Sequence, residues 1–365
     1  MTVYYVFMII SIVTYYLYKA DKIIVMRKLY CFFTGAFILG LFAFRDISLG
    51  MLDVEKNYTR LFYTLANEPL SYIFQRYSSD YLFYIFTKIV TLFTSNINVY
   101  LAISALPIVC AIGLLIYRFS EYPWLSWIIF FCLGYFSVHV TIMRQSVAMA
   151  LSIFMYMELQ QENYKRSVVL WLAAVGFHIT AAFSIVLIVM KKWKIRINIK
   201  TNCMVLGLSV LCFLFSDKIF EIAFSLISFE RFKRYSLHLS SFNTTLFLIN
   251  IVQCIFCVIL YYWQSAYTKD KNNESEYKGT LQQTENAMLV ILLFSLPFYA
   301  LTNTFSDIYR IGLYFSQFVI IAIPNFTRKS PIIIRGFIIF ALICVYFYYG
   351  AVRGLGEVSP YIAIL

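Results

Sequence analysis

Charged side chains are scarce in this sequence. Asp, Glu, Lys and Arg make up 13% of its 365 residues, whereas a soluble domain carries about 25%. Hydrophobic residues reach 61% and the mean hydropathy is +0.76, which is more apolar surface than one globular core can bury. The sustained alternation of a transmembrane β-barrel is also absent. The composition therefore predicts an all-α polytopic integral membrane protein.

Several motifs of soluble enzymes are missing too. The sequence contains no P-loop, no HExxH, no GxSxG and no acidic pair at metal-ligand spacing, so ATP hydrolysis, zinc proteolysis and serine hydrolysis have no support. The three histidines are scattered, and the CxxC pair Cys254 and Cys257 has neither a second pair nor a nearby histidine. We therefore expect no metal, no cofactor and no disulfide framework.

Twelve apolar segments account for most of the chain. Many approach the ~20 residues that a helix needs to cross about 30 Å of hydrocarbon, so we expect about 11–13 transmembrane helices in a single transmembrane domain, residues 1–365. The first segment lacks the basic start and the cleavage site of a signal peptide and is expected to be a span. The segments are residues 2–18, 29–44, 80–94, 97–117, 124–141, 144–160, 167–190, 201–216, 243–266, 286–302, 310–326 and 332–350.

Basic residues predict the orientation of these segments. The formal net charge is +12, and most of this excess is expected in cytoplasmic loops under the positive-inside rule rather than on a surface that binds nucleic acid. The densest basic cluster lies between Lys191 and Lys200. Placing this cluster and the polar loop 267–285 in the cytoplasm makes residues 45–79 and 217–242 external loops.

The stretch between residues 80 and 190 allows two topologies. Five full crossings give the right parity but place Lys165 and Arg166 outside. The alternative treats 80–117 as one broken crossing and lets 167–190 enter and return through an irregular or re-entrant element near Gly176, where it would have to line a cavity. The functional candidates favour the second topology.

Two polar residues lie in strongly apolar surroundings. Arg144, followed by Gln145, separates two apolar segments, and an arginine at membrane depth needs a carboxylate or an anionic ligand. Its structural alternative is an interfacial arginine that extends to the headgroups. His178 follows Gly176 in an apolar run. It is either a hydrogen-bonded packing residue or a general base, since an unperturbed imidazole titrates near neutral pH.

The expected external segments carry further candidates. Arg45 and Asp53 belong either to an interfacial loop or to a polar floor beside a membrane-facing site. A second group combines guanidinium groups, which bind phosphate bidentately, with neighbouring polar residues, and it fits a pyrophosphate. Its members are Glu230, Arg231, Arg234 and Tyr235, and Arg310 with Tyr314 adds a further arginine at the start of the apolar segment 310–326.

We predict that four arginines converge on one external-facing cavity. These are Arg144, Arg231, Arg234 and Arg310.

Five short motifs occur in a distinctive order. They are Phe44-Arg45 with Gly50, Asp53 and Tyr58; Ile142-Met143-Arg144-Gln145 with Ala148; Phe177-His178; Glu230-Arg231 with Tyr235; and Arg310-Ile311-Gly312 with Tyr314. Together they resemble the EpsG-like branch of the Wzy polysaccharide polymerases of bacterial envelopes, over residues 40–326. One departure is that Gly50 and Asp53 are separated here, whereas the family often has them adjacent.

This resemblance implies a metal-independent glycosyltransferase with a GT-C-like fold in the bacterial inner membrane and an active site facing the periplasm. Its substrates would be repeat units carried on undecaprenyl pyrophosphate, as in O-antigen and lipopolysaccharide biosynthesis. The growing chain would move onto the incoming unit, with release of undecaprenyl pyrophosphate. Expected partners are these lipid-linked oligosaccharides, membrane lipid and a chain-length-regulating membrane protein.

That chemistry gives each candidate an expected role. The arginines would stabilise the diphosphate leaving group, with Arg45, Gln145, Tyr235 and Tyr314 as further substrate-binding residues. His178 is the expected base for the acceptor hydroxyl, and Asp53 and Glu230 are its rivals.

Two other functions stay open. A flippase for the same repeat units would also need a cationic cavity, although the two halves of the sequence show no repeat. A membrane O-acyltransferase would favour a histidine near the N-terminus, and the first one here is His139.

Overall fold

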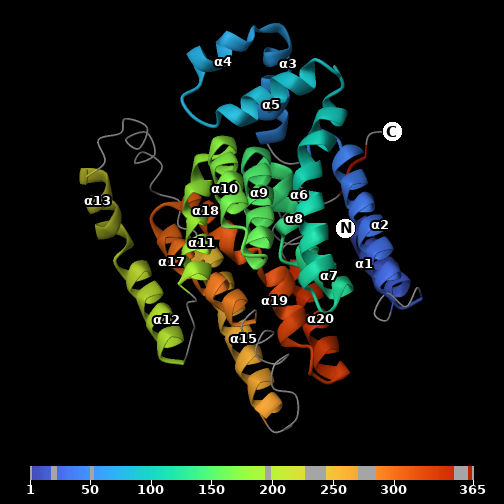
Figure 1. Ribbon diagram of the computed structural model, residues 1–365, viewed down its shortest axis with the longest axis vertical. Helices are drawn as coiled ribbons and strands as arrows, with labels where there is room; N and C mark the ends of the chain where they lie inside the picture. Colours follow the sequence, from blue (N-terminus) through green and yellow to red (C-terminus); the bar gives the residue numbers. More distant parts are fainter. Residues whose placement is uncertain are drawn as a thin grey trace. The chain divides into compact units, whose positions relative to one another are not determined.

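Helices account for nearly all regular structure in the computed structural model (Figure 1). The structure describes residues 2–17, 23–49, 53–193, 199–226, 244–269, 285–348 and 361–363. Within these ranges the extended pairing consists of one isolated antiparallel bridge between Arg45 and Ala363. The predicted all-α fold is confirmed.

The chain divides into two compact units. Unit 1 comprises residues 1–188 and 330–365, and unit 2 comprises residues 189–329. The assignment of all 365 residues to a single transmembrane domain stays a prediction.

Four described helices are long and apolar enough to cross a membrane. Unit 1 contains α2 (Ile24–Ala43) and α6 (Ile97–Phe119). Unit 2 contains Phe247–Ala266, within α15 (Thr244–Lys269), and Glu285–Asn303. By helix length and composition, the chain is a multi-pass membrane protein.

Two bent helix pairs raise the number of possible spans to six. In unit 1, α7 (Pro123–Cys132) and α8 (Tyr135–Thr141) are bent by 58° around Gly134, whose φ of 78° favours glycine. In unit 2, α12 (Ile199–Leu214) is bent by 76° against the start of α13 (Ser216–Leu226). Either pair is a broken span or a re-entrant element.

The described part of each of the twelve predicted segments is mainly helical, but the complete spans found among the described residues are fewer than the expected 11–13. The bends account for part of the difference. Short helices account for more, because the apolar parts of α1 (Thr2–Leu17), α5 (Tyr81–Thr91) and α20 (Ile332–Phe347) have only 10–17 residues.

Four helices of unit 1 pack one against the next. α2 lies against α6, α6 against α9 (Met143–Gln160), and α9 against α10 (Tyr164–Phe177). Most of α9 is buried, and its own apolar and small residues lie on all its faces. Its first turn is therefore held from several directions.

A layer of short helices, here called the cap layer, lies across one end of this bundle (Figure 1). Lys88 of α5 donates a hydrogen bond of 2.7 Å to the carbonyl of Leu65, near the end of α3, where backbone carbonyls lack helical partners. Most of the layer occupies the predicted external loop 45–79, whereas α5 lies in the predicted apolar segment 80–94, and the side of the membrane on which the layer lies stays a prediction. Its elements are the π-helix Asp53–Tyr58, α3 (Thr59–Asn67), α4 (Leu70–Arg76) and α5.

The predicted irregular element near Gly176 is confirmed. After α10 the chain is extended at His178 and forms a 3-10 helix (Ile179–Ser184) before α11 (Ile185–Lys192). Trp171 Nε1 donates a hydrogen bond of 3.2 Å to the carbonyl of Ala182. In a continuous helix these residues would be about 16 Å apart, so the chain has turned back on itself.

The described helices of unit 2 pack around α15. It lies against α17 (Leu296–Ala300) and α19 (Val319–Phe326), and α12 also lies against α17. At one end, Glu285 accepts a hydrogen bond of 2.8 Å from Gln264 and lies 3.5 Å from Arg328. The loop 267–285 and the segment 217–242 fall largely outside the described residues.

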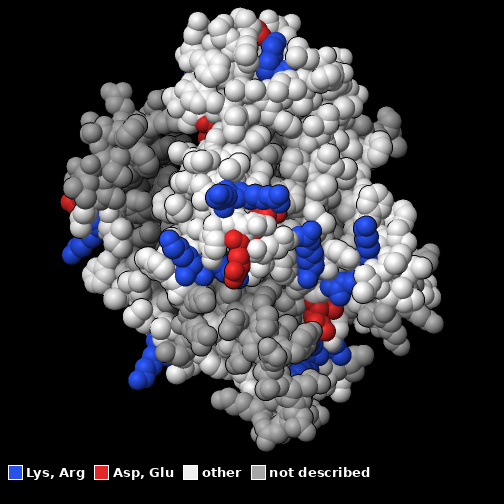
Figure 2. Space-filling model, viewed as in Figure 1, with Lys and Arg blue, Asp and Glu red and all other residues white. Residues whose placement is uncertain are grey.

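Apolar side chains remain exposed at helical spacing. On α15 these include Leu248, Val252 and Ile259, and α20 shows the same pattern at Phe337 and Phe340. Such stripes need lipid as their solvent. Figure 2 shows that most of the described surface on one face carries no charge.

Residues after 330 complete unit 1. α20 packs against α7, and the Arg335 guanidinium lies 4.6 Å from the centre of the Tyr122 ring. Tyr361 donates a hydrogen bond of 3.1 Å to the carbonyl of Leu41, beside the bridge between Arg45 and Ala363.

Gly176→Ala is expected to destabilise unit 1. A Cβ at Gly176 would lie 2.5 Å from Cδ1 of Leu82 on α5. Overpacking costs about 1–3 kcal/mol, more than the ~1 kcal/mol that alanine gains in helix propensity. The thermal midpoint of the purified protein in detergent measures the loss.

The matched control is Gly336→Ala in α20, where an added Cβ meets nothing within 4 Å. Its midpoint should stay unchanged or rise. Leu82→Ala should partly rescue Gly176→Ala. Equal midpoints for the two glycine variants would contradict the close-contact argument.

Candidate functional site

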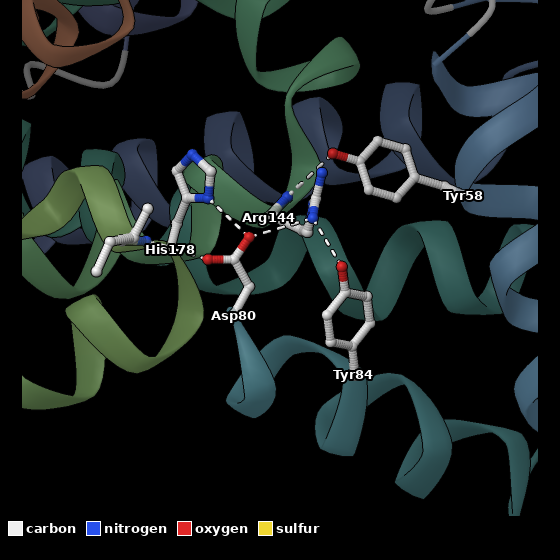
Figure 3. Close-up of polar contacts among 6 residues, drawn as sticks. Tyr58, Asp80, Tyr84, Arg144 and His178 are labelled. Atoms are coloured by element: carbon white, nitrogen blue, oxygen red, sulfur yellow. Dashed lines mark hydrogen bonds and ion pairs between the residues drawn. The ribbon is translucent and has the colours of Figure 1, made fainter. Parts of the chain in front are cut away.

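Asp80 joins the residues of the candidate site (Figure 3). It directly precedes α5, and its side chain is only 5% exposed. Its Oδ2 lies 3.1 Å from Nη1 of Arg144 and 3.2 Å from Nδ1 of His178. Its Oδ1 accepts a hydrogen bond of 3.1 Å from the backbone N–H of Ile179. One carboxylate therefore connects α5, α9 and the break after α10.

Helix ends bring these groups together. Asp80 has a left-handed φ of 60°, which aspartate tolerates better than most residues. His178 is extended between two helices, and Ile179 opens the 3-10 helix. Arg144 is the second residue of α9. Because helix starts leave N–H groups without intrahelical partners, the site combines polar backbone with polar side chains.

Arg144 is held by two tyrosines as well as by Asp80. Its Nη1 donates to the Tyr84 hydroxyl at 2.9 Å, and its backbone N–H donates to the Tyr58 hydroxyl at 3.4 Å (Figure 3). The Arg144 side chain is 36% exposed. The contacts with Asp80 and Tyr84 both use Nη1, and the Tyr58 hydroxyl also interacts with the Arg144 side chain.

The electrostatics of the cluster favour an ionised Asp80. This residue lies outside the four helices of spanning length. Burial raises the pKa of its carboxyl, but the hydrogen bond and charge of His178, together with Arg144 and the Ile179 N–H, more than offset burial and hold that pKa below its ordinary value. The charge of His178 contributes to this only when the imidazole is protonated; when the imidazole is neutral, the charges of Asp80 and Arg144 cancel.

The contact with Asp80 also defines the tautomer of His178. An ionised carboxylate can only accept, so Nδ1 of the imidazole carries the proton that points at Asp80. In the neutral ring Nε2 is then the acceptor. A carboxylate that orients a histidine in this way is one arrangement that can support general base catalysis.

Sequence reasoning identified Arg144 and His178 but missed Asp80, Tyr58 and Tyr84 as site residues. The hydrophobicity pattern places Asp80 at the start of the apolar segment 80–94. One signal was present: it is the only acidic residue between Glu68 and Glu121. An isolated carboxylate at the edge of an apolar run needs a cationic partner for the same reason as Arg144.

Other predicted residues of unit 1 lie elsewhere in the fold. Arg45 is buried and donates to the carbonyl of Val140 at 3.3 Å rather than to Asp80. Asp53 accepts a hydrogen bond of 2.8 Å from Asn57, in the π-helix that also carries Tyr58. Gln145 is buried beside Arg144. Their roles in substrate binding or catalysis stay predictions.

The remaining candidates belong to unit 2. Arg310, in the first turn of α18 (Tyr309–Ser316), lies 3.5 Å from Asp307, and Tyr314 is fully buried. The convergence of four arginines stays a prediction. The candidates outside the described residues are Glu230, Arg231, Arg234 and Tyr235.

In the part of the chain that the structure describes, no three His, Cys, Asp or Glu side chains are grouped closely enough to hold a metal ion.

Comparison with known proteins gives one match. The model of the EpsG family matches residues 28–362, which is most of the chain. No curated protein and no solved structure is similar enough to match.

Asp80 and Arg144 are expected to be energetically coupled. Removing one partner of a buried ion pair costs about 3–5 kcal/mol, and the partial exposure of Arg144 lowers that figure. A double-mutant cycle with Asp80→Asn and Arg144→Gln, measured by unfolding in mixed micelles, should give a coupling energy of about 1–3 kcal/mol.

The control cycle uses Glu158 and Arg166, whose charged atoms are 3.8 Å apart on a more exposed surface. Its coupling should stay below about 1 kcal/mol. Equal coupling in the two cycles would contradict the structural role assigned to Asp80.

Proposed function

Because the chain belongs to the EpsG family, whose members are membrane proteins of polysaccharide biosynthesis, we propose that it polymerises undecaprenyl-pyrophosphate-linked oligosaccharide repeat units. The growing chain passes from its lipid carrier to a hydroxyl of the incoming lipid-linked unit. Undecaprenyl pyrophosphate is the other product.

The observation that carries this proposal is the carboxylate shared by Arg144 and His178. A glycosyl transfer from a lipid diphosphate needs a base for the acceptor hydroxyl and a cation for the leaving group. Asp80 holds one group of each kind side by side. The basic clusters expected in the cytoplasm support an external site, because the cap layer then faces the other side.

The reaction proceeds in one displacement. Nε2 of His178 accepts the proton of the acceptor hydroxyl, whose oxygen bonds to the anomeric carbon of the growing chain. The bond between that carbon and the diphosphate oxygen breaks, and its electron pair leaves with the diphosphate. Arg144 donates hydrogen bonds to the diphosphate oxygens.

Charge changes within the cluster match this sequence of events. Before the reaction Asp80 and Arg144 cancel, so the site holds little net charge. When His178 takes the proton, the cluster gains one positive charge as negative charge develops on the leaving group, and Asp80 stabilises the imidazolium. A diphosphate carries more charge than this cluster neutralises. We therefore assign the remaining compensation to Arg231, Arg234 and Arg310.

Deletion of the gene separates polymerisation from transport. A strain lacking a polymerase should attach a single repeat unit to its surface anchor, whereas a strain lacking a flippase should attach none. Electrophoresis of the surface polysaccharide distinguishes these results. Full-length ladders that have lost only acetylation would favour an O-acyltransferase and contradict both.

His178→Ala is expected to reduce the polymerisation rate by about 10²–10⁴-fold, the usual contribution of a positioned base. Asp80→Asn should also reduce the rate, because an amide can offer its N–H and select the wrong tautomer. The assay uses reconstituted protein and lipid-linked repeat units. His139→Ala tests another buried histidine, which contacts Ser146 at 3.0 Å and not Asp80. Wild-type rate in His178→Ala would refute the base role.

Arg144→Ala and Arg310→Ala are each expected to abolish long chains without loss of membrane insertion. Both remove charge that the diphosphate needs. Polysaccharide ladders and the amount of protein in membranes provide the two readouts. Arg166→Ala is the matched control, since Arg166 is an exposed arginine of the same unit as Arg144. Normal ladders from both test variants would eliminate the role of these arginines.

A further inference from the structure

Helix α5 is apolar on two opposite faces. On one side, Phe83, Thr87 and Val90 are buried within unit 1. On the other side Tyr81, Ile89 and the following Phe93 are exposed. A helix in water would carry polar residues on its second face.

Lys88 is the only charged residue of α5, and its charged end does not project from that exposed face. Lys88 is directed at the end of α3, where its Nζ lies 2.7 Å from the Leu65 carbonyl. Lys88 shares a helical stripe with Tyr81 and Leu92, but its ammonium group is directed at α3, so the other exposed side chains of this face are tyrosine, aliphatic or phenylalanine side chains. Water is a poor solvent for such a face.

The apolar face continues onto α4. Leu70 and Phe74 are one turn apart on that helix and are 50% and 56% exposed. The Phe74 ring lies 5.6 Å from the Tyr81 ring, which joins the two helices into one strip. We call this strip the apolar edge. It consists of Leu70, Phe74, Tyr81, Ile89, Leu92 and Phe93.

The position of α6 places the apolar edge at a membrane surface. α6 has 23 residues, which gives it a length of about 34 Å and matches about 30 Å of hydrocarbon. Its first turn therefore lies near the membrane boundary. Leu92 and Phe93, 70% and 82% exposed, precede that turn by only a few residues.

We propose that the apolar edge of the cap layer lies in the boundary between headgroups and acyl chains of one leaflet, with lipid as its partner. A short helix with an apolar outer face takes this position in the plane of the membrane, about 5–10 Å into the boundary region. Arg60 and Arg76 of the same layer are exposed as well, together with Lys56 and Glu55, so charged side chains that suit polar headgroups lie in the same layer as the apolar edge.

This placement has a consequence for the substrate, and that part rests on the proposed function. Asp80 directly precedes Tyr81 of the apolar edge. The cluster of Asp80, Arg144 and His178 is then held at headgroup depth. A diphosphate attached to a membrane lipid would reach Arg144 by lateral diffusion, with its prenyl chain still in the bilayer.

Fluorescence quenching tests the depth of the apolar edge. Phe93→Trp and Phe74→Trp are reconstituted in nanodiscs whose lipids carry bromine either near the headgroup or near the chain end. The signal of each introduced tryptophan is its fluorescence minus that of the native protein. This signal should fall more with bromines near the headgroup (shallow) than with bromines near the chain end (deep). Phe33→Trp is the control, because Phe33 is exposed midway along the spanning helix α2 and should show the opposite order.

Two results would overturn the proposal. Quenching of Phe93→Trp and Phe74→Trp by aqueous iodide but by neither lipid would place the edge in water. Stronger quenching by the deep bromines would place it in the bilayer centre. Polymerisation is assayed in the same nanodiscs. If the bromines near the headgroup quench the introduced tryptophans but the native protein forms no polymer, the proposed function is refuted and the lipid contact stands. If aqueous iodide quenches them and polymer forms normally, only the lipid contact is refuted.

Discussion

A buried carboxylate with cationic neighbours is the constraint on which the functional end of unit 1 depends. Asp80 is nearly inaccessible to water, so its charge is stable only where donors surround it. Arg144, His178 and the Ile179 N–H supply them from two other elements. The positions of α5, α9 and the break after α10 are therefore coupled. Moving any one of them would leave a charge without its partner.

The surrounding packing explains why these positions are precise enough for chemistry. α9 is buried along most of its length, so the backbone of Arg144 has little freedom to move. The hydrogen bond between Trp171 and Ala182 holds the 3-10 helix Ile179–Ser184 against α10. Gly176 allows α5 to approach α10 closely. Three helix ends meet in this way without a soluble domain to hold them. Rigid neighbours of this kind reduce the reorganisation that a catalytic site would otherwise require.

The fold class followed from composition because apolar content is a property of the whole chain. Arg144 and His178 could also be identified, since each is a polar residue within an apolar run. The irregular element after α10 could be predicted as well, from Gly176 and the basic residues Lys165 and Arg166, whereas the place of Asp80 in the site and the bend at Gly134 depend on contacts between segments distant in sequence. Local hydrophobicity contains little information about such contacts, and the same property concealed the difference between α5, which lies across the bundle, and α6, which is long enough to cross a membrane. The convergence of Arg231, Arg234 and Arg310 on the same site stays a prediction for that reason.

The bridge between Arg45 and Ala363 has a consequence for biosynthesis. Unit 1 contains the first 188 residues and also those after 329, and all of unit 2 is translated between these two parts. While a ribosome is still producing unit 2, α7 lacks α20 and Leu41 lacks its hydrogen bond from Tyr361. The helices that carry Asp80, Arg144 and His178 must therefore persist in the membrane as an unfinished unit. Unit 1 is therefore completed only after the whole of unit 2 has been synthesised.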